Sequence, residues 1–123
     1  MKKIMFYGLS AEREIEIALP LKEKFKAEIR MLDQSCLNKS LGSLFGGEDI
    51  TVDDEEYGKV DKEFMMLKDF DNDDTKALLD FFKANSIQRP IACGLTKTNS
   101  SWSLGELFKQ LSLEDEYMKR NQN

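Results

Sequence analysis

The sequence predicts an α/β fold of two tandem β-α-β-α units, which form one small, mostly parallel sheet packed with helices. Short, nearly continuous apolar runs alternate with segments of helical periodicity, a pattern typical of strands buried in parallel sheets. The hexapeptide S-L-G-S-L-F at 40–45 also returns as S-L-G-E-L-F at 103–108, 63 positions later (Ser40 and Ser103). We therefore expect an internal duplication around a pseudo-two-fold axis.

Composition limits the chemistry that the chain can perform. Its 123 residues, 41% hydrophobic and 33% charged, are typical of a single globular domain spanning 1–123. There is no histidine, which excludes Ser-His-Asp and Cys-His catalysis and zinc sites that use imidazole. The two cysteines, Cys36 and Cys93, are too far apart in sequence for a C-x-x-C motif. We expect reduced thiols, and we predict no catalytic residue, no metal site and no cofactor.

The first unit is predicted to span 1–47. The apolar runs 4–9 and 27–32 indicate buried strands, and Ser10 is placed to cap the helix between them. That helix should kink or restart at Pro20. Its expected apolar face contains Ile15, Ala18, Leu19 and Phe25.

The run 4–9 also bears on localisation, because Lys2 and Lys3 precede it. It is too short for the core of a signal peptide, so we expect a cytoplasmic protein without a membrane segment. A second helix of the first unit begins near Ser40 and should end at Gly46 and Gly47.

Acidic residues concentrate between the two units. Eight carboxylates and two lysines lie between 48 and 63, although the whole chain has a net charge of only -5. We interpret 48–62 as an acidic, solvated linker in which four residues could act as anchors: Ile50, Val52, Tyr57 and Val60. The rest of the chain is nearly neutral, so nucleic acid is not an expected partner.

The second unit is predicted to span 63–113, followed by a polar tail, 114–123, that either extends the last helix or frays. Strands are expected at 63–70 and 91–96, both too apolar for an exposed edge. Asp71 should cap the intervening helix, and Asp73 belongs to its first turn, an interpretation we favour over a calcium loop. The apolar stripes are Leu78, Phe81 and Phe82 on this helix and Leu104, Leu107, Phe108 and Leu111 on the last.

The loop 96–103 follows a predicted parallel strand and precedes a helix, where α/β sheets often bind anions. Ser103 and Glu106 also fit a capping box, and Trp102 with Leu107 fits a hydrophobic staple, so the loop could equally be structural, with Trp102 plugging the core. If the loop binds a ligand, the residues that bind it are Thr96, Lys97, Thr98, Asn99, Ser101 and Trp102.

Two further expectations concern small residues. Gly42 and Gly105 occupy equivalent first turns, where glycine weakens a helix, so we expect close packing inside the protein at both or close approach of a ligand. Cys93 should be a small, inert core residue, whereas Cys36 should be more exposed.

The segment PIACGLTKTNSSWSLGELF, with the trailing 114–118, resembles a prokaryotic family known only as a domain of unknown function. Its T-x-T-N-x-x-W signature matches Thr96, Thr98, Asn99 and Trp102. Lys97 stands where a proline commonly separates the two threonines. The resemblance implies no activity.

We therefore expect a non-catalytic domain that acts through contacts with another protein or as a homodimer. An exposed apolar patch for such contacts should include some of Phe6, Tyr7, Leu79, Phe81, Phe108 and Met118, unless the linker covers it. The alternative is a module that binds a small anion or nucleotide through the 96–103 loop. An enzyme using Cys36 or Cys93 as a thiol is a more remote hypothesis.

Overall fold

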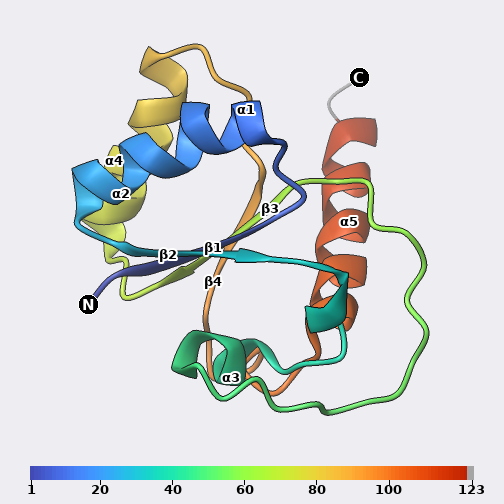
Figure 1. Ribbon diagram of the computed structural model, residues 1–123. Helices are drawn as coiled ribbons and strands as arrows, with labels where there is room; N and C mark the ends of the chain where they lie inside the picture. Colours follow the sequence, from blue (N-terminus) through green and yellow to red (C-terminus); the bar gives the residue numbers. More distant parts are fainter. Residues whose placement is uncertain (122–123) are drawn as a thin grey trace. The chain divides into compact units, whose positions relative to one another are not determined.

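The computed structural model describes residues 1–121 and divides into two compact units (Figure 1). The first contains Met1–Met31 and Lys62–Gly94, and the second contains Leu32–Asp61 and the chain from Leu95 onward. Each sequence half contributes a segment to both units. The predicted polar tail 114–123 ends in two residues that lie outside the described part of the chain.

The first unit contains a four-stranded sheet in the order β2-β1-β3-β4. Its strands are β1 (Lys3–Tyr7), β2 (Glu28–Leu32), β3 (Phe64–Lys68) and β4 (Ile91–Gly94). β3 and β4 are parallel, as a β-α-β crossover requires, but β1 and β3 are antiparallel. The sheet is therefore mixed and not purely parallel, because its central pair is antiparallel. The central pair of strands joins the two halves of the sequence. An apolar run indicates a buried strand, but it does not indicate in which direction that strand pairs with its neighbour.

Helices cover one face of this sheet (Figure 1). A continuous helical segment contains α1 (Ala11–Arg13), the π-helix η1 (Glu14–Ala18) and α2 (Leu19–Phe25), and α4 (Asn72–Ala84) packs beside it. Asp71 forms the predicted cap of α4, as a capping box with Asp74. The buried core contains Ile4, Phe6, Ile17, Ala18, Leu21, Ala27, Met65, Leu67, Leu78 and Phe82.

The π-helix explains one error in the predicted helix face. Leu19 N–H donates to Glu14 O, five residues back, and α2 restarts at Leu19 with Pro20 in its first turn, as expected from the proline. A π-helical turn contains more residues than an α-helical turn, so the face shifts. Ile17 and Leu21 become fully buried, whereas Ile15 and Leu19 face outward.

The second unit contains the 3-10 turn η2 (Gln34–Cys36), the short helix α3 (Leu41–Gly46) and the long helix α5 (Leu104–Arg120). Ser103 caps α5 by accepting a hydrogen bond from the Glu106 N–H. Three residues of the predicted stripe, Leu104, Leu107 and Phe108, are buried. α5 continues into the expected tail as far as Arg120, and its C-terminal half exposes Leu113, Tyr117 and Met118.

Within this unit, the segments that precede α3 and α5 pair in antiparallel fashion at Ser40 and Ser103. Leu41 N–H donates to Trp102 O at 3.0 Å, and Leu104 N–H donates to Lys39 O at 2.9 Å. A second pair joins Gly42 N–H to Ser100 O and Gly105 N–H to Leu37 O, both at 2.9 Å. The two bonds of each pair are related by the same offset as the hexapeptides.

Burial corrects several other expectations. Phe6, Tyr7 and Phe108 are buried and cannot contribute to a surface patch, whereas Leu79 and Met118 are exposed. β4 is an edge strand with half-buried residues, contrary to the prediction. The cysteines are reversed: Cys36 is buried, and Cys93 is half-buried on β4 because that strand is outermost.

Candidate functional site

The loop after β4 is organised by hydrogen bonds among its own residues. Thr96 N–H donates to Asn99 Oδ1 at 2.8 Å, and Asn99 N–H donates to Thr96 Oγ1 at 3.0 Å. Ser100 N–H and Trp102 N–H close two further turns on Thr96 O and Asn99 O. The Thr96 hydroxyl and the Asn99 amide oxygen thus stabilise the turn, and Asn99 is buried.

The remaining predicted ligand-binding residues of this loop point to solvent or are partly covered. Lys97, Thr98 and Ser101 are exposed, and Trp102 is half-buried and so does not plug the core as expected. Ser103 forms only the cap half of the predicted capping box. Anion binding by the exposed residues remains a prediction.

Tyr57 anchors the acidic segment 48–62 to the start of α5. Its hydroxyl lies 2.7 Å from Ser103 Oγ and donates to Asp53 Oδ2 at 2.6 Å. Asn38 Nδ2 donates to Asp53 Oδ1 and to Glu55 O, so both oxygens of the Asp53 carboxylate are engaged. The Lys109 ammonium stands over the Tyr57 ring, 5.2 Å from its centroid. The segment is acidic, as predicted, but it is not wholly solvated.

These contacts shift two ionisations in opposite directions. The hydrogen bond from Tyr57, followed by weaker bonds from Asn38 and Ser103, lowers the pKa of Asp53 despite some desolvation. Burial and then the nearby Asp53 carboxylate raise the pKa of Tyr57. At neutral pH the pair is therefore a carboxylate that accepts from a neutral phenol. This arrangement stabilises the segment, and the raised pKa keeps the Tyr57 phenol neutral and therefore a weak nucleophile.

Tyr57 also accounts for one of the two unusual glycines. A Cβ at Gly105 would stand 2.5 Å and 2.6 Å from atoms of the Tyr57 ring, and a Cβ at Gly42 would meet Ser100, including its carbonyl oxygen at 3.1 Å. The expected close approach is confirmed at both positions, and the groups that approach the two glycines are residues of the protein itself.

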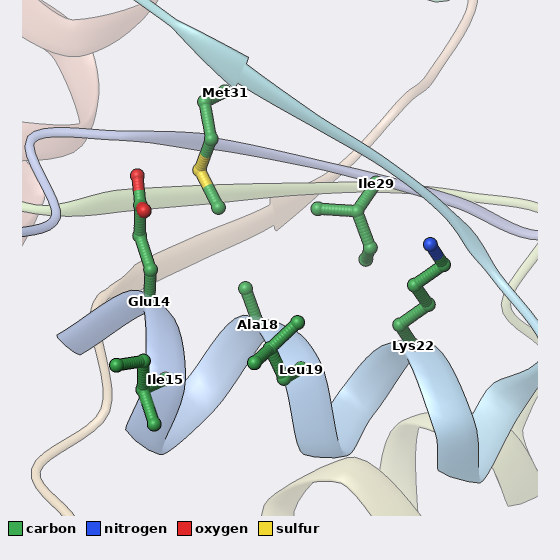
Figure 2. A pocket seen from close by; sticks show the side chains of 7 residues that line it. All are labelled: Glu14, Ile15, Ala18, Leu19, Lys22, Ile29 and Met31. Atoms are coloured by element: carbon green, nitrogen blue, oxygen red, sulfur yellow. The ribbon is translucent and has the colours of Figure 1, made fainter. Parts of the chain in front are cut away.

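A groove of about 250 Å³ lies between the helical segment 11–25 and the edge strand β2 (Figure 2). Ala18 forms its floor, and Ile29 and Met31 reach into it from β2. Ile15, Leu19 and Met31 are 66%, 56% and 40% exposed, so three large apolar side chains meet water in one place. The sequence assigned Ile15 and Leu19 to the core, and the π-helix turns them into this groove instead.

The two ends of the groove have opposite charges. Glu14 lies beside Met31 at one end and Lys22 lies toward Ile29 at the other, and both side chains extend from the helix toward β2 (Figure 2). Among residues 1–121, neither the Glu14 carboxylate nor the Lys22 ammonium has an ion-pair partner, whereas the neighbouring Glu16 pairs with Arg13. Sequence reasoning missed Glu14, Lys22 and Met31. The sequence did contain a signal of an exposed apolar face on this helix. Pro20 interrupts the helix, and the helix has more apolar residues than a single buried face can hold.

Other catalytic or binding arrangements find no support in the described residues. Within 1–121, no group of three or more His, Cys, Asp or Glu side chains is placed to hold a metal ion. Cys36 is buried with its sulfur 4.0 Å from Asp33 Oδ1, and Cys93 is partly covered. None of the described helices is long and apolar enough to cross a membrane.

One model of a protein family matches part of the chain. Residues 63–118 match the profile of a domain of unknown function, DUF3783. The matched segment contains β3, α4, β4 and most of α5, which make up one β-α-β-α half. Searches of curated proteins and of solved structures found no significant match.

Proposed function

We propose that the chain is a cytoplasmic, non-catalytic interaction domain that binds a protein through the groove between η1, α2 and β2. The observation that carries this proposal is the exposure of three large apolar side chains that line one groove, Ile15, Leu19 and Met31. Single exposed apolar residues are ordinary on protein surfaces, but a concave cluster with charged ends is typical of a binding surface. Burial of these side chains by a partner would remove them from water at a gain of about 25 cal/mol per Å².

The chemistry elsewhere in the described chain supports a role without catalysis. The hydrogen-bonded side chains Asp53, Tyr57 and Ser103 serve each other and the cap of α5. In the polar turn after β4, Thr96 and Asn99 likewise form hydrogen bonds with each other. A partner protein therefore has a better-defined surface on this chain than a small molecule has.

We further propose that the chain arose by duplication of one β-α-β-α unit. Three observations support this. The sheet order β2-β1-β3-β4 places one half on each side of an antiparallel centre. The paired hydrogen bonds around Ser40 and Ser103 follow the offset of the hexapeptides. The family match spans one such unit.

A site-specific crosslinking experiment tests the interaction proposal. A benzophenone amino acid replaces Leu19 in the groove or, as a control, Leu113, which is similarly exposed on α5 (59% against 56%). After irradiation in cells, mass spectrometry of the adducts should identify a protein joined at position 19, either a second copy or another chain. Adducts that are absent at position 19, or no more frequent than at position 113, would contradict the proposal.

A further inference from the structure

We infer that the occupant of the groove is a second copy of this chain, docked by a two-fold rotation that places the two grooves face to face. This inference rests on the proposed function and names its partner. In a two-fold interface each surface meets itself, so a residue at one end of the groove meets the residue at the other end of its partner. The groove suits this geometry because its ends carry opposite charges.

The charges are the specific argument for self-recognition. Glu14 and Lys22 lie at opposite ends of the groove, point to the same side and have no ion-pair partner among residues 1–121 (Figure 2). Two-fold docking brings Glu14 of each copy to Lys22 of the other, which forms two intermolecular ion pairs. Between them, Ile15, Leu19 and Met31 of both copies lose their contact with water. A partner whose contact surface carried charges of a single sign would be repelled at one end of the groove.

The position of the groove at the sheet edge favours the same arrangement. β2 is the outermost strand beside the groove, so the two-fold rotation also brings two β2 strands toward each other. Edge strands are a common route of association between copies. The apolar part of the contact is small, so we expect a reversible dimer with a dissociation constant on the order of 10 micromolar.

Charge reversal tests the orientation directly. Sedimentation equilibrium measures the self-association of wild type, Glu14→Lys and Lys22→Glu. Each single variant puts like charges at both ends of its homodimer, and we expect about tenfold weaker association. A mixture of the two variants restores both ion pairs in the heterodimer, so the mixture should associate about as tightly as wild type. If Glu14 instead faced Glu14 and Lys22 faced Lys22, wild type would already oppose like charges at both ends, so neither single reversal would weaken association.

Two matched controls isolate the groove. The variants Glu12→Lys and Lys76→Glu change the net charge by the same amounts at exposed positions outside the groove lining, and neither should weaken association, alone or mixed. Leu19→Ser should abolish the dimer, whereas Leu113→Ser, equally exposed on α5, should not. Circular dichroism of each variant confirms that it remains folded.

The outcomes separate this inference from the proposed function. Wild type that remains monomeric at several hundred micromolar, or a mixture that associates no better than its components, overturns the second copy as the occupant. If crosslinking at position 19 then captures a different protein, the proposed function stands without this inference. If neither self-association nor a specific adduct is found, both are wrong.

Discussion

Gly105 illustrates how one residue joins two distant segments of the sequence. It lies in the first turn of α5, where alanine would favour the helix by up to about 1 kcal/mol. The Tyr57 ring occupies the space that a side chain would need. The sequence alone could pair Gly105 with Gly42 and predict close packing at both, but it could not name Tyr57, because 48 positions separate the glycine from the ring that contacts it (57 to 105).

Because of this close contact, replacing the helical glycine at position 105 by alanine should lower the stability of the protein, although this substitution usually stabilises a helix. Gly105→Ala should destabilise the protein by about 1 kcal/mol, because displacement of the aromatic ring costs more than the gain in helix propensity. Gly46→Ala in α3 is the matched control: its added methyl meets only the flexible Glu48 side chain, at 3.5 Å, and should stabilise by roughly 0.5 kcal/mol. Urea denaturation measures both.

The cause of the Gly105 effect is also testable. In a Tyr57→Ala background the ring is gone, so Gly105→Ala should become neutral or stabilising. A loss of the same size in both backgrounds would show that Tyr57 is not the obstacle.

At the scale of elements, the π-helix and the acidic segment show why periodicity was an incomplete guide. A regular α-helix through 11–25 predicts Ile15 and Leu19 in the core, but one π-helical stretch before Pro20 turns both outward. Composition predicted a solvated segment at 48–62, and most of it is exposed, yet one aromatic residue anchors it to α5. Tyr57 was among the anchors that the sequence suggested.

The anchor gives the acidic segment a specific dependence on pH. Tyr57→Phe removes the hydroxyl that bonds to Asp53 and Ser103 and should cost about 1–2 kcal/mol at pH 7. The folded protein lowers the pKa of Asp53 mainly through this hydroxyl, so the associated stability is present above the unfolded pKa of 3.8 and is lost as pH falls through the folded value. The difference in the free energy of unfolding between wild type and Tyr57→Phe should therefore become smaller below about pH 4.

The alkaline side provides a second test of the same contact. Folding raises the pKa of Tyr57, so its contribution is present below the unfolded value of 10.0 and is lost as pH rises above it. Urea denaturation at pH 3, 7 and 10.5 measures the whole profile, with Tyr117→Phe, exposed on α5, as the control. If the difference in the free energy of unfolding between wild type and Tyr57→Phe stays constant with pH, the coupling of Tyr57 to Asp53 is contradicted.

For the whole molecule, the sequence predicted which segments form strands and helices better than it predicted how the strands pair. The four strands and the capped helices α4 and α5 lie within a few residues of their predicted bounds, because burial and capping leave local patterns. Strand direction at the centre of the sheet depends on how the two halves meet, and no local pattern encodes it. The groove escaped prediction for a related reason, since a helical irregularity and an edge strand create it together.

The proposed duplication makes a prediction about each unit of the molecule. In an experimental structure, superposition of residues 3–46 on 64–109 should require a rotation near 180° within each unit and should place Ser40 on Ser103 and Gly42 on Gly105. A two-fold relation generates such contacts in pairs, because every hydrogen bond from one half to the other has a symmetric counterpart. The reciprocal bonds of Leu41 with Trp102 and of Leu104 with Lys39 are one such pair. If the halves trace different paths, or align only at another offset, the shared hexapeptide is a coincidence and the chain was not built from two copies of one unit.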